Sequence, residues 1–371
     1  MQDCIPFKLL LLNNNEQQKM IYILILSDQK PGHYNQSLGV VERIDNCQYH
    51  IINVAYRRKL HDNLLRIATC IFGRYLLPKK IIRFCLKLTL SSKTLSEIAS
   101  IQHTDAIIST GSSVAAINLL LGQLLNAQTV TCRHPSPVGT DFFDLAILPQ
   151  TSWPKQKKPN LCQTTGGPNR ISPEKLKEQA ETLRRNINIS SSITIGLLIG
   201  GDDRYHTICP QTITNLLHTL RTLSQEFDLK ILLATSRRTP STINNLITKD
   251  MLDTLVCPIC ILADRQNKYT VTDIFSLSDL LIVTEDSFSM VCEAASSGRK
   301  LVILGVTRRI SKSPKQDLVY SEMEQMEHIK WVQITEIKTT ILSLLKQKMV
   351  IEPLRDSEIA ANAVLQLLGR N

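Results

Sequence analysis

The feature that most constrains the fold is a recurring order of buried strand, polar loop and helix. An apolar, β-branched run over residues 21–26 is followed by a Gly-containing loop and a helical pattern from Asn35 onward. A strand over 105–109 and an apolar helix over 114–125 repeat this order. Continuous apolar strands that alternate with helices are typical of parallel sheets covered on both faces. The sequence therefore predicts an α/β protein with doubly wound sheets.

The order restarts after a connecting segment, residues 151–172, that is rich in Pro, Lys, Gly and Asn. A helix start at Ser172-Pro173 and a new strand over 193–199 follow. A chain of 371 residues has room for two domains of ~100–200 residues each. We predict five parts: an N-terminal extension (1–19), an N-terminal domain (20–172), a linker helix (173–190), a C-terminal domain (191–350) and a C-terminal helix that packs back (351–371).

The charge balance predicts anionic partners. The formal net charge is +10, which favours phosphorylated small molecules, a phospholipid surface or nucleic acid. Aromatic residues make up only 5% of the chain and no known nucleic-acid-binding module is recognised, so we expect no nucleic-acid partner. No apolar run reaches the ~18 residues of a membrane-spanning helix, and we expect no signal peptide.

The ten cysteines are scattered, which fits reduced thiols in a cytoplasmic protein. Cys257 and Cys260 have CxxC spacing, but no second pair or histidine stands at zinc-binding distance in the sequence. Asp202-Asp203 is an acidic pair, and its position after two glycines is more typical of a loop cap than of a metal site. We therefore predict no obligatory metal and no cofactor.

Residues 64–89 combine Leu, Ile and Phe with six Lys or Arg residues, and with Pro78 as a break they predict one or two amphipathic helices. Two interpretations stay open. The helices suit peripheral binding to an anionic membrane surface, or they form a core pair whose basic residues face water.

The strongest local motif is residues 281–298, LIVTEDSFSMVCEAASSG. A buried strand leads into the polar elbow 284–287, and a helix of small residues follows. Amide groups and the helix dipole at such a start favour a diphosphate. Asp286, Ser289 and Glu293 stand at i, i+3 and i+7, so we expect them on one helix face. The alternative is an ordinary helix cap and a solvated glutamate.

The segment TEDSFSMVCEA at 284–294 resembles the motif of the plant "elongated mitochondria" fission family and its bacterial relatives, which are GT-B-type glycosyltransferases. At 150–153 the family tends to carry a charged pair or His-Asp, whereas this chain has QTSW. Further similar blocks occur in family order: SDQKPGHYNQS (27–37), RHPSP (133–137), FDLAILP (143–149), TTGGPNRIS (164–172), GLLIGGDDR (196–204) and ATSRRTP (234–240).

The resemblance implies a GT-B-like fold, with two Rossmann-like doubly wound domains facing each other across a cleft. It also implies that the C-terminal domain binds a nucleoside-diphosphate sugar. Gly200 and Gly201 would then let the backbone approach the phosphates, and Ser236 and Arg237 would bind the diphosphate. Asn267 and Tyr269 would lie beside the nucleotide, and Glu293 would accept hydrogen bonds from the ribose hydroxyls. The other predicted donor-binding residues are Thr284, Glu285, Asp286, Ser287, Ser289 and Met290.

The N-terminal domain would supply the acceptor side. His33 is the candidate general base with Asp28 as its partner, because imidazole titrates near working pH; the alternative is a histidine that only forms surface hydrogen bonds. Gly111 opens a second helix start, and Arg133 and His134 would neutralise an acceptor phosphate. The acceptor-side residues are Lys30, Gly32, Asn35, Gln36, Gly111, Ser112, Arg133 and His134.

The predicted function is transfer of a sugar from a nucleoside diphosphate to an acceptor, lipid-linked at the cytoplasmic face of a membrane. Two alternatives remain at this point. One is a non-enzymatic membrane-surface adaptor of the mitochondrial-fission type. The other is a nucleotide-sugar epimerase, which would bind the same donor but isomerise it without an acceptor.

Overall fold

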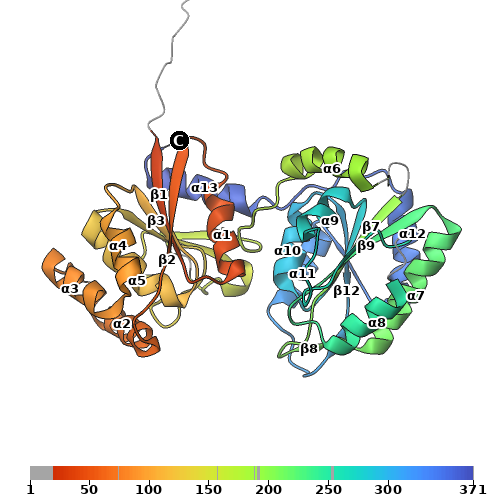
Figure 1. The fold of residues 1–371 in the computed structure, drawn as a ribbon, viewed down its shortest axis with the longest axis horizontal. Coiled ribbons are helices and arrows are strands. Elements are labelled where there is room, and N and C mark those ends of the chain that lie inside the picture. The colour runs from red at the N-terminus through yellow and green to blue at the C-terminus, as the bar shows by residue number, and fades with distance from the viewer. Residues whose placement is uncertain are drawn as a thin grey trace, which may run out of the picture.

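The computed structural model describes residues 20–73, 75–156, 158–187, 189, 193–251 and 255–370. It contains two six-stranded sheets, each built of parallel strands and covered by helices, in two lobes that lie side by side (Figure 1). The predicted α/β class with two Rossmann-like domains is confirmed. The extension predicted over residues 1–19 lies outside the described residues.

The first sheet has the strand order β2-β1-β3-β4-β5-β6. Its strands are β1 (Ile21–Ser27), β2 (Cys47–Asn53), β3 (Ala106–Ser109), β4 (Gln128–Thr131), β5 (Leu145–Pro149) and β6 (Leu161–Thr164). Its helices are α1 (Pro31–Val41), α2 (Lys59–Phe72), α3 (Lys79–Thr89), α4 (Ser92–Ala99), α5 (Ser112–Leu125) and the 3-10 turn η1 (Gln150–Ser152).

Alternation along β1 divides the core of this domain in two. Ile23 and Ile25 pack toward α1, whereas Leu24 and Leu26 pack toward α2, α3, α4 and α5. Both sides of the strand are therefore buried, which is why its sequence is continuously apolar.

The helix α6 (Pro173–Ile187) leads to the second sheet, whose order is β10-β9-β7-β11-β12-β14. The remaining elements are β7 (Ile193–Ile199), β8 (His206–Thr207), α7 (Pro210–Glu226), β9 (Leu229–Thr235), α8 (Ser241–Met251), β10 (Ile259–Ile261), α9 (Val271–Leu277), β11 (Leu280–Thr284), α10 (Phe288–Ser296), β12 (Lys300–Leu304), β13 (Thr307–Arg308), α11 (Gln316–Gln325), β14 (Lys330–Val332), the 3-10 turn η2 (Ile334–Glu336), α12 (Ile337–Lys346) and α13 (Asp356–Leu367).

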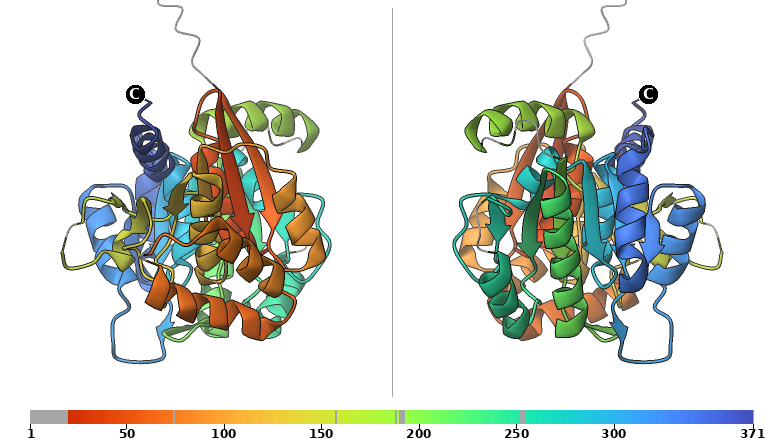
Figure 2. Two further views of the ribbon diagram at one scale, coloured as in Figure 1. Left: turned by 90° about the vertical axis from the view of Figure 1, so that its left-hand side faces the viewer. Right: turned by 90° about the vertical axis from the view of Figure 1, so that its right-hand side faces the viewer.

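The second sheet is also covered on both faces. Helices α7, α8 and α12 bury one face, which the right-hand view of Figure 2 presents to the reader, and α9, α10 and α11 bury the other. Because both faces are covered, the ligand-accessible parts of this domain are its strand ends and the loops that follow them.

The last helix, α13, returns to the first sheet and packs beside α1 (Figure 1). Ala360, Ala361 and Val364 join the core around Val40 and Val41. Small residues on α13 let the helix lie close to α1. The chain therefore crosses between the domains twice, once before α6 and once before α13.

The start of α1 differs from the sequence prediction. The helix begins at Pro31 rather than near Asn35, so Gly32 and His33 lie in its first turn and not in a loop. The fixed φ of a proline at the first position suits a helix start, since its missing N–H needs no partner there. Among the described residues, no helix has the length and apolar character needed to cross a membrane.

Candidate functional site

Three neighbouring cavities run from the N-terminal domain to the C-terminal domain. The first, of about 290 Å³, lies by the start of α5 and has Arg133 in its wall. The second, of about 80 Å³, lies between the domains and shares Arg133 with the first. The third, of about 560 Å³, lies by α6, α9 and α10 and shares Asn35 and Glu293 with the second. The shared wall residues show that the three cavities adjoin one another.

The first cavity is built around Asp28, which directly follows β1. Its carboxylate accepts hydrogen bonds from Ser113 Oγ at 2.9 Å and His33 Nδ1 at 3.0 Å, and it pairs with Lys30 Nζ at 3.1 Å. Burial raises the pKa of Asp28, but these partners outweigh it and lower the pKa below its ordinary value. An ionised carboxylate can only accept, so His33 donates from Nδ1 and keeps Nε2 for the cavity that it lines.

Gly111 brings the start of α5 against this histidine. Its φ is +102°, and a Cβ at this position would lie 2.5 Å from His33 Nδ1. Only glycine combines this backbone conformation with such a close approach. No side chain caps the start of α5, and Ser112, Arg133 and His134 line the same cavity. The cavity thus joins open helix amides to basic side chains, an arrangement that suits an anion.

Sequence reasoning missed three residues of this cavity. Asp62 and Arg66 on α2 line it as an i, i+4 ion pair at 3.0 Å, and Ser113 holds Asp28. The only available signal was the four-residue spacing of Asp62 and Arg66. That spacing is common on helix surfaces and did not indicate a site.

The role predicted for Asp286 is wrong in one respect. It precedes α10, so it does not share a helix face with Ser289 and Glu293. Its buried carboxylate turns back into the domain, where it accepts from Gly201 N at 2.8 Å and from Thr284 Oγ1 at 2.7 Å. It also pairs with Arg238 Nη2 at 3.1 Å. Burial raises the pKa of Asp286.

The same contacts show that the predicted role of Gly200 and Gly201, to let the backbone approach the phosphates, is wrong. A Cβ on Gly200 would overlap the carboxylate of Asp286, and one on Gly201 would overlap the backbone of Arg238. The glycines are required by packing inside the protein. In this structure the space above them holds Asp286, so a phosphate against these two amides is not supported.

Glu285 is also directed inward. Its carboxylate accepts from Val306 N at 2.8 Å, from Arg308 Nη2 at 2.6 Å and from Trp331 Nε1 at 3.1 Å. Burial raises the pKa of Glu285. Glu285 therefore does not line the cavities described above, unlike Glu293.

The open part of the motif lies one turn further along, in α10. No side chain caps the start of this helix at Ser287, whereas the start of neighbouring α9 is closed by a capping box between Thr270 and Asp273. Ser289 lines the second cavity, Met290 the third, and Glu293 both. The first turn of α10, which no side chain caps, therefore borders the space between the domains.

Glu293 is the most unusual residue of the site. Its side chain is partly buried, and within the described part of the chain it makes no hydrogen bond or ion pair. Burial alone raises the pKa of Glu293 to about 7. A half-buried carboxylate that lines a cavity and has no partner in the described chain is typical of a group that bonds to a ligand.

The opposite wall carries a second polar group without a partner. Gln36 Oε1 on α1 is buried and unbonded, and Gln36 lines the second cavity with Asn35 and Gly32. A Cβ on Gly167 would lie 2.8 Å from Gln36 Nε2, so the glycine leaves room for this side chain. Both domains therefore present unpaired polar atoms to one small interdomain space.

The remaining predicted donor residues lie in two loops after β9 and β10. Ser236 Oγ accepts from Arg238 N at 3.1 Å, and Arg237 is exposed without a hydrogen bond or ion pair in the described chain. Asn267 bonds to the backbone of Leu262 and closes its own loop. Tyr269 stacks under the ammonium of Lys268 at 5.2 Å and packs against the core. None of these residues lines the three cavities.

Potential metal ligands form no cluster. Among the described residues, no group of three or more His, Cys, Asp and Glu side chains is arranged to hold a metal ion. Asp202 accepts from Ile208 N at 2.8 Å, and Asp203 accepts from Tyr205 N at 2.7 Å. Both aspartates thus cap their own loop.

Comparison with known proteins gives a family and a fold. A family model described as "Mitochondrial fission ELM1" matches residues 31–368. The search of curated proteins gave no significant match.

Among solved structures, a UDP-N-acetylglucosamine 2-epimerase is similar at 13% identity, with a TM-score of 0.53, over 94% of this chain and 95% of the other. The Methanocaldococcus jannaschii UDP-GlcNAc 2-epimerase in complex with UDP-GlcNAc and UDP is similar at 12% identity, with a TM-score of 0.50, over 94% of this chain and 99% of the other. MurG of Acinetobacter baumannii is similar at 13% identity, with a TM-score of 0.45, over 94% of this chain and 98% of the other. The two epimerase structures, together with the two parallel six-stranded sheets, show a fold of the GT-B type.

Proposed function

We propose that this chain, which belongs to the mitochondrial fission ELM1 family, binds a nucleoside-diphosphate sugar between its domains and transfers the sugar to an acceptor. The observation that carries the proposal is Glu293. It is a carboxylate without a partner, in the wall that two interdomain cavities share. It also lies two turns after the uncapped start of α10.

The chemistry of a nucleotide sugar fits these groups. Ribose hydroxyls donate hydrogen bonds, and an ionised Glu293 offers four lone-pair positions to accept them. A diphosphate accepts from the free amides at the start of α10 and is favoured there by the helix dipole. One solved structure of similar fold contains UDP-GlcNAc and UDP, which supports this class of ligand.

The first cavity supports transfer rather than isomerisation. An epimerase needs only the nucleotide sugar, whereas a transferase needs a second site on the other side of the cleft. The cavity around His33 offers a base with a free Nε2, oriented by Asp28, and a basic lining from Lys30 and Arg133. We propose that His33 accepts the proton of the attacking hydroxyl and that Arg133 and His134 hold an anionic acceptor.

The acceptor is proposed to be lipid-linked and presented at the cytoplasmic face of a membrane, which agrees with a net charge of +10. Leaving-group stabilisation would come from the start of α10 with Arg237, which is free to reach the diphosphate when the cleft closes. No metal takes part in this scheme.

Calorimetric titration with UDP-, GDP-, ADP- and CMP-sugars tests the proposal. One of them should bind the wild type, and Glu293→Ala should weaken that binding at least tenfold, because two ribose hydroxyls lose their acceptor. Glu181→Gln on exposed α6 is the control and should bind as the wild type does. Binding of none of these nucleotides would favour the adaptor alternative, and isomerised sugar formed without an acceptor would favour the epimerase.

The pH dependence adds an independent readout. Because the pKa of Glu293 is about 7 in the free protein, its carboxyl is largely protonated at pH 6 and ionised at pH 8. Ribose hydroxyls bond better to the ionised form, so donor affinity should rise between these values and then level off. An affinity that is flat with pH, or equally pH-dependent in Glu293→Gln, would exclude Glu293 from the ribose contact.

A further inference from the structure

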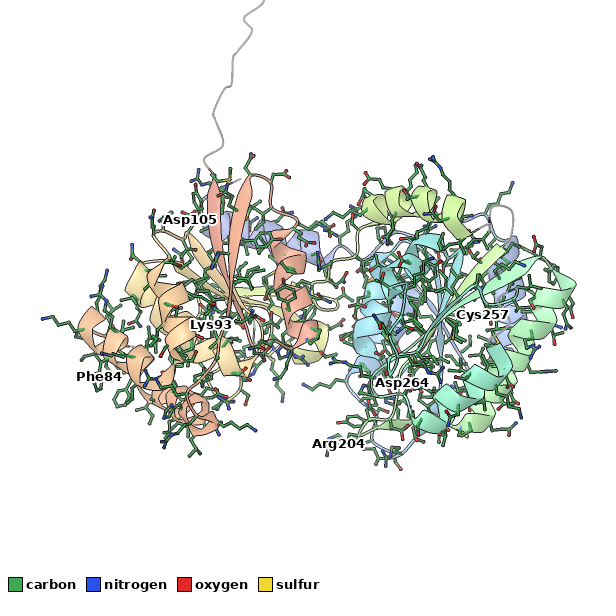
Figure 3. All side chains as sticks on the ribbon, viewed as in Figure 1. Phe84, Lys93, Asp105, Arg204, Cys257 and Asp264 are labelled. Carbon is green, nitrogen blue, oxygen red and sulfur yellow. The ribbon has the colours of Figure 1, made fainter. Side chains whose placement is uncertain are left out.

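The outer side of the N-terminal domain carries an unusual apolar surface. Of the 22 large apolar side chains that are exposed in the described part of the chain, ten lie within residues 60–88. They come from α2, α3 and the segment between them, and the label of Phe84 in Figure 3 marks the outer edge of the domain. Phe84 is 67% exposed and Leu76 is 90% exposed. We refer to this surface as the α2–α3 face.

On α2 the apolar side chains form a stripe opposite the cavity. With about 100° per residue, Leu60, Leu64, Ile67 and Ile71 fall within about 60° of each other on one side of the helix. All four are exposed. Asp62 and Arg66, which line the first cavity, fall on the other side of the same helix.

Around the axis of α3 lie a buried apolar sector, a basic sector and an exposed apolar sector. Ile82 and Leu86 are buried in the core, whereas Phe84 and Leu88 are exposed beside a basic sector that includes Arg83. A core helix pair of the kind considered from the sequence would bury its apolar side chains and expose its charges. Here a second apolar stripe stays in contact with water, beside the basic sector.

The charge of this region is the main source of the net charge of the protein. Residues 57–93 contain ten Lys or Arg residues and one acidic residue, Asp62, an excess of nine in a chain whose net charge is +10. Asp62 is paired with Arg66. Exposed Lys79, Lys80, Arg83 and Lys87 flank the apolar stripe of α3. An apolar stripe with basic margins complements an anionic lipid surface, where the charges meet headgroups and the apolar side chains enter the acyl boundary.

We infer that the α2–α3 face docks onto an anionic lipid bilayer and places the first cavity at the membrane surface. The two sides of α2 connect these functions, since a helix is only about 10–12 Å across. An acceptor held in the cavity therefore lies about one helix diameter from the lipid. This inference rests on the proposed function, because docking would bring the first cavity to the bilayer that holds the lipid-linked acceptor. Membrane docking and sugar transfer can nevertheless be tested separately.

The test is flotation of the full chain with vesicles of phosphatidylcholine, with and without a phosphatidylglycerol fraction. Wild-type protein should float with the anionic vesicles and lose this binding at high salt. The triple variant Ile67→Ser, Ile71→Ser, Phe84→Ser should bind at least tenfold more weakly, because three large apolar side chains no longer enter the interface. The variant Lys79→Gln, Lys80→Gln, Arg83→Gln, Lys87→Gln should lose about fivefold per residue, or more than 100-fold in all.

The matched control is the triple variant Phe227→Ser, Leu318→Ser, Ile359→Ser, which changes three exposed large apolar residues elsewhere on the protein. It should float as the wild type does. Calorimetry with the donor nucleotide should give unchanged affinity in all three variants, which separates membrane docking from the proposed reaction. Equal flotation of the Ile67 triple variant and the control would overturn the inference. So would a wild-type dimer in light scattering that the Ile67 triple variant converts to monomer, since a second copy would then cover the face.

Discussion

The two domains use the same place in the fold in opposite ways. In the N-terminal domain the aspartate after β1, Asp28, turns toward a cavity and holds His33 there. In the C-terminal domain the aspartate after β11, Asp286, turns inward and binds Gly201 and Arg238. Carboxyl ends of parallel strands are the usual ligand edge of such sheets. The difference shows that a strand end can instead be used to hold neighbouring loops together.

The candidate ligand groups therefore lie at different distances from the strand ends in the two domains. In the N-terminal domain they lie directly at the strand ends, in the first turns of α1 and α5. In the C-terminal domain Glu285 and Asp286 are engaged with neighbouring loops, and the open groups lie within α10, at Ser289 and Glu293. A motif of adjacent polar residues can therefore combine structural and ligand-facing members.

Replacement of each aspartate by alanine tests the difference between the two strand ends. Asp286→Ala should lower the free energy of unfolding by about 2–4 kcal/mol, because it leaves the buried donors Gly201 N and Thr284 Oγ1 without their acceptor. Asp28→Ala should cost only about 1–2 kcal/mol, because Lys30 and His33 can bond to water instead. Urea denaturation measures both. Equal losses would mean that the two strand ends have the same structural role.

The next largest effect concerns Glu293 and pH. Its pKa in the folded protein, about 7, lies above its ordinary value of 4.5, so the unfolded chain ionises first. Stability should therefore fall as pH rises from about 4.5 to 7 and then level off, by about 2 kcal/mol after allowance for partial exposure. Glu293→Gln should remove this slope, whereas Glu181→Gln should keep it. Thermal unfolding at several pH values measures the slope, and an unchanged slope in Glu293→Gln would contradict the assignment.

The smallest effect distinguishes two adjacent arginines. Arg238 pairs with buried Asp286, so Arg238→Ala should cost about 1–2 kcal/mol of stability, reduced from the value for a buried pair because its side chain is 43% exposed. Arg237→Ala should change stability by less than about 0.5 kcal/mol, because its exposed side chain has no bonded partner in the described chain. Affinity for the donor nucleotide should show the opposite order. If both variants fold, Arg237→Ala should bind the donor more weakly than Arg238→Ala does. A stability loss in Arg237→Ala as large as in Arg238→Ala would contradict this division.

The order of apolar strands and helices along the sequence is enough to predict the class of fold and its two Rossmann-like domains. Continuous apolar strands such as β1 and β7 can only be buried on both faces, and alternation with helices requires parallel sheets. These signals are local and depend on residue type. The same local signals placed the polar residues of 284–287 after a strand and before a helix, where the structure has them.

Which polar residues line the cavities depends instead on contacts between segments far apart in the chain. Asp286 was predicted to share the face of Glu293, but the backbone of 284–287 turns it toward Gly200 and Gly201, which directly follow β7 about 85 residues earlier. The cavity role of Asp62 and Arg66 likewise depends on α2 packing near Gly111. The physical reason is that the direction of a side chain is set by partners distant in sequence, whereas strand and helix patterns are set by neighbours.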